Sequence, residues 1–305
     1  MNVIECRGLA KRYRRAWALR DCGLVIPEGH VVALVGPNGA GKTTLLNLAA
    51  GLFRPTAGDI TVLGGQQPGS GAARVGIGFV SQDAPLYGHL RAGDMLALAG
   101  NLNITWSHER ALARLADLRV PVDRKVRALS GGQRAQLALT IALAKRPRLL
   151  ILDEPLARLD PLARHEFMAS LMAEVAEEGL SVVFSSHVVA ELERIADYLI
   201  VLNEGRLQLA GVVEDLLAVH RVLTGPENEN ALDAQRIAVV HTRKAGAQTH
   251  LLVRNSAPGA PAPEGWQSDP ASLEDLVLGY LRDPGARMLP GPAMAASAGG
   301  PAVTP

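Results

Sequence analysis

The sequence predicts an α/β protein built on a mostly parallel β-sheet with helices on both faces. Three short, mainly apolar segments carry this prediction: His30 to Val35, Arg148 to Leu152 and Leu180 to Ser185. Segments of this kind are typical of strands that are buried on both faces, as in a parallel sheet. Each is followed by a turn and then by a polar–apolar pattern that indicates a helix, and this alternation of strand and helix defines the fold class.

The start of the chain is expected to form an N-terminal antiparallel β subdomain. Residues 2–35 read as short strands that are interrupted by Gly8, by Gly23 and by the turn at 27–29. Glycine and proline commonly mark the turns between strands. After a glycine-rich loop, a helix is predicted from about Lys42 to Ala50.

A block of helices is expected to interrupt the sheet. Residues 84–145 are almost wholly helical in pattern, with predicted helices at Met95 to Gly100, Ser107 to Leu118 and Ser130 to Lys145. Because these helices stand between strands of one sheet, they are expected to form a helical subdomain inserted into the core.

The sheet is expected to end in a hairpin. Tyr198 to Leu202 and Leu207 to Ala210 are apolar segments joined by the turn at 203–206. Residues 212–223 are predicted to form a helix that leads out of the core.

A small α+β extension is expected to follow. The polar residues 225–235 are predicted to be a linker, and Ile237 to His241 with Thr249 to Arg254 predict a hairpin. Ser272 is a good N-cap for a helix over Leu273 to Leu281.

The end of the chain is rich in proline, alanine and glycine, a composition that predicts disorder. The predicted division is a main domain at 1–223, an extension at 224–283 and a disordered tail at 284–305.

The composition disfavours several classes of function. The chain has 31 basic and 30 acidic side chains, which leaves no basic surplus for wrapping nucleic acid. Its two cysteines, Cys6 and Cys22, are too few for a disulfide framework and lack metal-ligand spacing, so reduced thiols are expected. No apolar run approaches the ~18 residues of a transmembrane helix, and no secretory signal is evident. A cytoplasmic protein is expected, one that reaches a membrane only through partners.

A glycine-rich loop carries the first chemical motif. Residues 36–43 fit the pattern G-x-x-x-x-G-K-[ST], with a predicted strand before and a predicted helix after. The glycines allow backbone N–H groups to surround an anion, Lys42 can reach the β- and γ-phosphates of a nucleotide, and Thr43 offers a hydroxyl to Mg²⁺. A chance glycine turn is the alternative, which the flanking pattern disfavours. The predicted nucleotide-binding residues of this phosphate loop are Gly36, Pro37, Asn38, Gly39, Ala40, Gly41, Lys42, Thr43 and Thr44.

Two acidic residues end the second buried segment. Asp153 and Glu154 follow Leu152 directly, and the carboxyl ends of parallel strands are where ligands bind. Asp153 is predicted to hold Mg²⁺, directly or through water, and Glu154 to polarise the attacking water as a general base. The alternative is that two acids simply begin a loop, which the phosphate loop makes less attractive.

The segment Leu129 to Gln133, hereafter the signature segment, reads LSGGQ. Ser130, Gly131, Gly132 and Gln133 start a predicted helix and so form a second candidate anion site. A helix cap without further function is the alternative. With the phosphate loop before it and Asp153 twenty residues after it, the segment resembles the ABC ATPase family, and the resemblance covers about residues 2–215.

This resemblance implies further site residues. Gln82 is similar to the family glutamine that senses Mg²⁺ and the attacking water, and His187 to the histidine that contacts the γ-phosphate. Asp160 matches the loop that crosses the dimer interface. Tyr13 stands where the family stacks an aromatic ring on adenine, with Trp17 close enough in sequence to be the alternative.

The resemblance also implies a fold and an activity. It implies a P-loop NTPase core, with ATP and Mg²⁺ as cofactors and ATP hydrolysis as the reaction. The subunit would pair with itself or with a related ATPase subunit, sandwiching ATP, and dock on separate transmembrane permease subunits at the inner face of the cell membrane.

Export is favoured over import for two reasons. The extension is smaller than the regulatory domains of many importer ATPases, and residues 83–87 look like those of exporter relatives. The transported substrate cannot be read from the sequence.

Two other classes of function fit the sequence less well. A soluble ABC ATPase acting on ribosomes or DNA usually has two nucleotide domains or long coiled-coil inserts, whereas this sequence has one phosphate loop, one signature segment and no sustained heptad pattern. A metabolic P-loop kinase has no use for the signature segment.

Overall fold

The computed structural model describes residues 1–83, 85–186, 189–226, 238–245, 248–254, 262 and 265–288. Within this part of the chain the strands form three sheets, of six, three and four strands.

The central sheet has the strand order β5-β6-β7-β3-β8-β9. Its members are β3 (Val31–Val35), β5 (Ile77–Val80), β6 (Leu149–Leu152), β7 (Ser181–Ser186), β8 (Tyr198–Asn203) and β9 (Arg206–Val212). The first five strands in that order are parallel, while β9 pairs antiparallel with β8 in the predicted hairpin. The predicted α/β class with a mostly parallel sheet is therefore confirmed.

Strand β3 shows why its sequence has no polar alternation. Val32 and Leu34 pack into one hydrophobic core, while Val31, Ala33 and Val35 pack into another on the opposite face of the sheet. Every residue of β3, and likewise of β6, is buried. A strand that is covered on both sides needs apolar side chains at every position.

A three-stranded antiparallel sheet precedes and flanks this core. It has the order β2-β1-β4, with β1 at Asn2–Tyr13, β2 at Ala16–Pro27 and β4 at Ala57–Val62. In sequence, helix α1 (Lys42–Ala49) lies between β2 and β4, and helix α2 (Gly71–Gly76) follows β4. The expected antiparallel β subdomain is present, and β4 extends it beyond residue 35.

The predicted helical block forms with its own core. It contains α3 (Ala92–Leu102), α4 (His108–Asp117), a short 3-10 turn at Val126–Ala128 and α5 (Gly131–Leu143). Leu96, Leu115 and Leu137 are among the buried residues that join these helices. The α5 helix also packs against α6 (Pro161–Glu178) and β5, which connects the block to the central sheet.

The C-terminal part adds a four-stranded antiparallel sheet of order β11-β12-β10-β13. Its elements are α8 (Val213–Val219), β10 (His220–Gly225), β11 (Ala238–Ala245), β12 (Gln248–Arg254), β13 (Gln267–Pro270) and α10 (Leu273–Arg282). The α10 helix packs on β8 and β9 as well as on β11 and β12. It therefore attaches the extension to the central sheet.

Two predictions for this part differ from the structure. The helix expected over 212–223 ends at Val219, because residues 220–225 pair with β12 on one side and β13 on the other. These partners are distant in sequence and outweigh local helical preference. The tail expected to be disordered from 284 begins with a 3-10 helix at Pro284–Met288, in which Ala286 is buried. Most of the predicted linker lies outside the described residues.

A buried polar network joins α8, β10, β12 and α10. The His220 ring lies with Nδ1 2.6 Å from the Leu216 carbonyl oxygen and Nε2 3.0 Å from the Tyr280 hydroxyl. Arg254 donates to the same hydroxyl at 3.4 Å. Burial lowers the pKa of His220 to about 4, so the ring is neutral at physiological pH.

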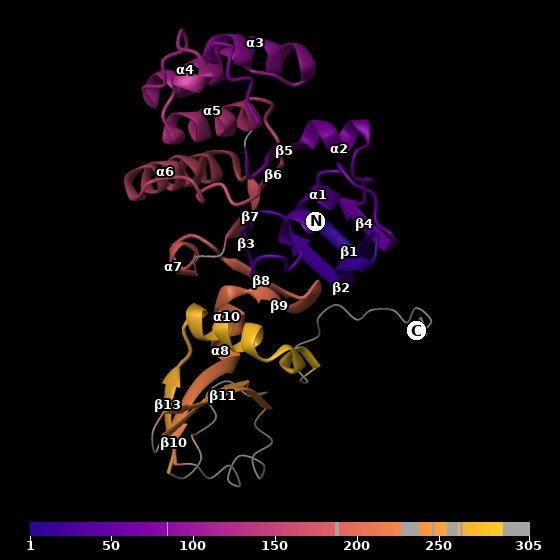
Figure 1. Ribbon diagram of the computed structural model, residues 1–305, viewed down its shortest axis with the longest axis vertical. Helices are drawn as coiled ribbons and strands as arrows, with labels where there is room; N and C mark the ends of the chain where they lie inside the picture. The colour runs from indigo at the N-terminus through magenta and orange to yellow at the C-terminus, as the bar shows by residue number, and fades with distance from the viewer. Residues whose placement is uncertain are drawn as a thin grey trace.

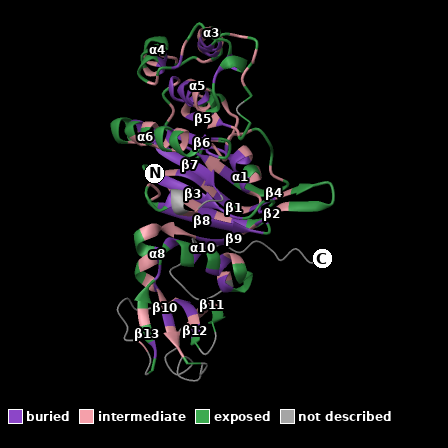
Figure 2. Ribbon diagram, turned by 60° about the vertical axis from the view of Figure 1, so that its left-hand side comes forward, coloured by how far each residue is buried: buried purple, intermediate pink, exposed green. Residues whose placement is uncertain are grey.

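The molecule is elongated, with three tiers along its length (Figure 1). Helices α3, α4 and α5 lie at one end. The central sheet and the three-stranded sheet lie in the middle, and the C-terminal four-stranded sheet lies at the other end. Buried residues are concentrated in the strands of the central sheet, while the outer helices carry exposed faces (Figure 2). None of the helices in the described part of the chain is long and apolar enough to cross a membrane.

Candidate functional site

The phosphate loop joins the end of β3 to the start of α1. Gly39 and Gly41 have φ angles of 82° and 105°, in the left-handed region that favours glycine. A Cβ on Gly36 would lie 2.2 Å from the carbonyl oxygen of Leu202, and one on Gly41 would lie 2.4 Å from that of Ala18. The loop is thus wedged between β8 and β2, and packing as well as backbone conformation requires these glycines.

The N-terminus of α1 is open. Its N-cap residue, Gly41, makes no side-chain capping hydrogen bond, and no acidic residue stands in the first turn. Unsatisfied N–H groups and the helix dipole at such an end bind anions well. Thr43 is exposed beside this end, and Thr44 is partly buried. The loop residues therefore fit a phosphate group in front of α1.

Lys42 lies at the centre of the candidate site. Its side chain is 5% exposed, and Nζ donates to the carbonyl oxygens of Gly36 and Pro37 at 2.7 and 3.2 Å. The same nitrogen is 3.5 Å from Oε1 of Glu154. One ammonium group therefore connects the phosphate loop with the acidic residues that follow β6.

The two acids are held by a serine on the neighbouring strand. Ser185, in β7, donates its hydroxyl hydrogen to Oδ1 of Asp153 at 2.8 Å and accepts the backbone N–H of Glu154, also at 2.8 Å. Glu154 has a φ of 46°, an unusual backbone conformation for a non-glycine residue. Ser185 thus helps to keep the Glu154 backbone in this conformation, while Asp153 remains buried.

Sequence reasoning assigned no role to Ser185. The only signal available was its position at the end of a buried strand next to the predicted His187. Its contacts depend on β6 and β7 being neighbours, which a single sequence does not reveal.

Gln82 belongs to the segment that follows β5, at an edge strand of the central sheet. Gln82 is exposed, two residues after β5 ends at Val80, and β5 runs parallel to β6. Asp83, next to Gln82, accepts a hydrogen bond from Arg158 at 2.7 Å. His187 lies outside the described residues.

The signature segment forms the start of α5, and this helix end is closed. The Ser130 hydroxyl accepts the N–H of Gln133 at 3.1 Å, and Oε1 of Gln133 accepts the N–H of Ser130 at the same distance. This capping box satisfies two of the orphan N–H groups. The Ser130 hydroxyl hydrogen remains available to a further acceptor, and Ser130 and Gly131 are exposed.

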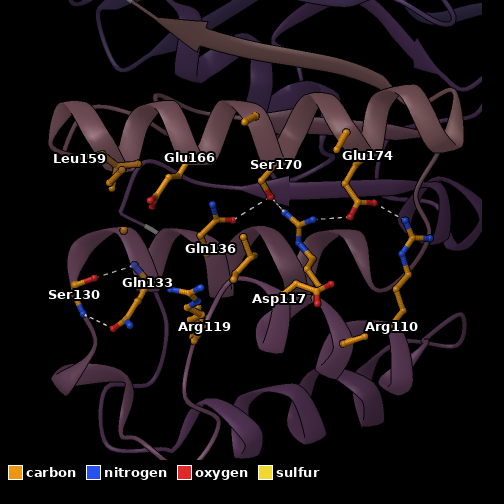
Figure 3. Close-up of a pocket in the computed structure, with 18 of the residues that line it drawn as sticks. Arg110, Asp117, Arg119, Ser130, Gln133, Gln136, Leu159, Glu166, Ser170 and Glu174 are labelled. Carbon is orange, nitrogen blue, oxygen red and sulfur yellow. Dashed lines mark hydrogen bonds and ion pairs between the residues drawn. The ribbon is translucent and has the colours of Figure 1, made fainter.

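Asp160 caps α6 next to the signature segment. Its Oδ1 accepts the N–H of Ala163 at 2.9 Å. A Cβ on Gly132 would lie 3.0 Å from Cβ of Ala163, so the two helix starts are close neighbours. Figure 3 shows Ser130 and Gln133 at one end of a groove between α5 and α6.

Tyr13, at the end of β1, is 41% exposed and belongs to an aromatic cluster. The Phe53 ring meets it edge-on at a centroid distance of 6.1 Å, and Lys11 Nζ is 5.3 Å from the Tyr13 centroid. Trp17 is 38% exposed and carries the Arg12 guanidinium 5.5 Å from its ring centroid. Both rings remain candidates for stacking on a base. Phe53 is a neighbour of Tyr13 that no sequence motif points to.

Comparisons with known proteins agree with this geometry. A family model described as ABC transporter matches residues 19–157. The spermidine/putrescine import ATP-binding protein PotA of Spiroplasma citri is 33% identical over 70% of this chain, which covers 63% of that relative's length. The lipopolysaccharide export system ATP-binding protein LptB of Acidithiobacillus ferridurans is also 33% identical, over 71% of this chain and 92% of its own length.

A solved structure is similar as well. It is a dimeric post-hydrolysis state of the ATP-binding cassette MJ0796 bound to ADP and Pi, with a TM-score of 0.62 and 27% identity. The match covers 69% of this chain and 98% of that one. The chain therefore belongs to the family of ABC transporter ATP-binding subunits and is a P-loop ATPase of that family.

Proposed function

We propose that this chain is the ATP-hydrolysing subunit of an ABC transporter and that it works as a dimer with ATP at the interface. The observation that carries the proposal is the position of Lys42, whose Nζ contacts two phosphate-loop carbonyls and lies 3.5 Å from the Glu154 carboxylate. Residues more than 100 positions apart in sequence thereby meet at one edge of the sheet.

The phosphate loop would hold the nucleotide. Its backbone N–H groups and the open end of α1 suit the β- and γ-phosphates, with Lys42 moving from its loop carbonyls to the phosphate oxygens. Tyr13 would stack on adenine, supported by Phe53 at its edge.

The residues present fit a magnesium ion. Thr43, Gln82 and Asp153 offer hydroxyl, amide and carboxylate oxygens, the hard donors that Mg²⁺ prefers alongside phosphate and water. Bound there, the ion would neutralise charge on the phosphates. Ser185 would keep the Asp153 carboxylate oriented, because it donates to one of its oxygens.

Glu154 would act as the general base toward the attacking water, with His187 and Gln82 contacting the γ-phosphate and that water. The Glu154 backbone conformation, stabilised by Ser185, sends its carboxylate toward Lys42 and the phosphate loop rather than along the line of β6.

The signature segment would complete the site of a second subunit. Ser130 keeps a hydroxyl hydrogen to donate to a γ-phosphate while it caps α5, and the exposed Gly131, with Gly132 and Gln133, completes that surface. Asp160, at the neighbouring helix start, would lie at the same interface. The dimeric similar structure, with ADP and Pi, supports this arrangement.

We further propose export through separate transmembrane permease subunits, with this chain at the inner face of the cell membrane. The similar proteins include both import and export ATP-binding subunits, so export rests on the size of the extension and on residues 83–87.

The partner ATPase subunit would be a second copy or a close relative. The proposed division remains 1–223, 224–283 and 284–305, and the first residues of the last segment, Pro284–Met288, form a short 3-10 helix. The alternative is a soluble ABC ATPase acting on ribosomes or DNA, and the protein with which this chain co-purifies would separate the two.

The Glu154→Gln variant tests the catalytic assignment. We expect ATP turnover to fall by about 100-fold to 1,000-fold, as for other removals of a central catalytic group, while ATP binding is retained and the ATP-bound dimer accumulates. Phosphate release and gel filtration with ATP provide the measurements. Turnover equal to that of the unsubstituted chain would remove Glu154 from the mechanism.

A further inference from the structure

An ion-pair cluster connects the helical block with the core at a distance from the nucleotide residues. Glu174, on α6, pairs with both Arg110 and Arg114 on α4, the latter at 2.5 Å. Arg110 also pairs with Glu178 at 2.6 Å. We call these four residues the α4–α6 clamp.

The inner pair of the clamp, Glu174 with Arg114, is largely buried. The side chains of Glu174 and Arg114 are 10% and 11% exposed, so the pair is only weakly screened by salt. Burial lowers the pKa of Arg114, and the adjacent Glu174 carboxylate partly offsets this effect. Removing one partner of such a pair leaves an uncompensated buried charge, which is strongly unfavourable.

Among the residues that the structure describes, α4 and α6 contribute to different buried apolar clusters. Ala111 and Leu115 of α4 belong to the core of the helical block, whereas Phe167 and Leu171 of α6 belong to the core under the central sheet. Between α4, α5 and α6 lies a groove of about 1440 Å³. In this groove α4 is connected to α6 by polar contacts, as the dashed lines in Figure 3 show.

The clamp also reaches the helix that begins with the signature segment. Ser170, one turn before Glu174 on α6, accepts a hydrogen bond from Arg114 and donates to Oε1 of Gln136 at 3.5 Å. Gln136 is buried on α5, three residues after Gln133. A continuous series of polar contacts thus runs from α4 through α6 to the first turns of α5.

We propose that Glu174 is a positioning residue that fixes the helical block on α6. In this way the signature segment and the Asp160 loop keep the relative placement needed to complete the nucleotide site of a second subunit. The expected effect of Glu174 on ATP turnover rests on the proposed function. Its expected effect on the placement of α4 relative to α6 concerns this chain alone.

The geometric part is tested without ATP. Spin labels on Ala116→Cys in α4 and Ala176→Cys in α6 report the distance between the helices by pulsed electron paramagnetic resonance, and both native residues are exposed. The native Cys6 and Cys22 are buried and burial raises the pKa of both thiols, so they resist labelling. We expect a single narrow distance distribution that Glu174→Gln broadens.

A matched control comes from the same helix. Glu177 is exposed and lies outside the clamp, so Glu177→Gln should leave the distribution narrow, and Glu174→Asp, which keeps the charge, should restore part of the order. If Glu174→Gln prevents folding, Glu178→Gln removes only the outer pair and should broaden the distribution less. If neither Glu174→Gln nor Glu178→Gln broadens the distance distribution, the proposal is overturned.

Turnover supplies the second measurement. We expect Glu174→Gln to lower kcat by about 10-fold to 100-fold, the range for a misplaced site group, while KM for ATP stays within about twofold. Equal kcat values for Glu174→Gln and Glu177→Gln would overturn the positioning role. If the unsubstituted chain itself shows no turnover, the proposed function has failed, and the distance measurement still decides whether the clamp exists.

Discussion

The phosphate loop and the signature segment are both glycine-containing starts of helices, yet they are built differently. The N-terminus of α1, which begins with Lys42, has no capping side chain. The N-terminus of α5 instead carries the reciprocal hydrogen bonds of Ser130 and Gln133. The first is ready to accept an anion by itself. The second has two of its N–H groups bonded to side chains of its own first turn, and Ser130 keeps a hydroxyl hydrogen for a further contact. The difference suggests that nucleotide affinity comes from the first and that the second acts only after the nucleotide is bound.

The strongest test of this contrast is Lys42→Ala. We expect the affinity for ATP to fall about 100-fold, roughly 3 kcal/mol, because a charge-assisted contact to phosphate is lost. Titration with a fluorescent ATP analogue measures the change. Lys145→Ala is the control, since Lys145 also donates to a backbone carbonyl, that of Arg74, but lies outside the loop. Equal affinities for the two variants would mean that the phosphate loop is not the nucleotide site.

Ser130→Ala tests the other half, and its expected effect is smaller. Loss of the N-cap should lower the free energy of unfolding by about 1 kcal/mol, and loss of the hydroxyl should lower turnover about tenfold. ATP affinity of the monomer should not change. Ser272→Ala removes the same type of capping box from α10 and should cost similar stability without lowering turnover. A fall in ATP affinity for Ser130→Ala would contradict the proposal that the phosphate loop provides the affinity and the signature segment acts after binding.

Substitution of the two exposed rings should have the smallest effect. Tyr13→Ala is expected to weaken ATP binding about fivefold, roughly 1 kcal/mol, while binding of inorganic triphosphate is unchanged. Trp17→Ala should leave both affinities unchanged. If Trp17→Ala instead weakens ATP binding, the base stacks on Trp17. If neither substitution matters, the base is held elsewhere.

The sequence predicted the central strands, the helical block and the β8–β9 hairpin because each has a local pattern. It failed where long-range pairing decides the structure. Residues 220–223 are predicted as the end of a helix, yet they belong to β10, which pairs with β12 and β13. The same limit applies to the candidate site. Asp153 and Glu154 are predictable because they stand at the end of a buried strand. The role of Ser185, which contacts both residues, depends on the pairing of β6 with β7, and no local pattern reveals that pairing.

The clamp residues escaped selection for a related reason. Arg110, Arg114 and Glu174 look like ordinary solvated charges on amphipathic helices, because the pairing partners are separated by about 60 positions. Arginine is also common in this sequence, so two arginines on one helix are not distinctive by themselves. Their burial between two helices is a property of the packed structure.

The wedged position of the phosphate loop also bears on mutational tolerance. At Gly36 and Gly41 one added carbon atom would overlap backbone oxygens of Leu202 and Ala18, and backbone cannot move aside as a flexible side chain can. Random substitution at these two positions should therefore yield almost no folded variants that bind nucleotide, whereas Gly39, with open space around it, is limited mainly by its φ angle. The neighbouring strands therefore require glycine at positions 36 and 41, whatever nucleotide chemistry the loop performs.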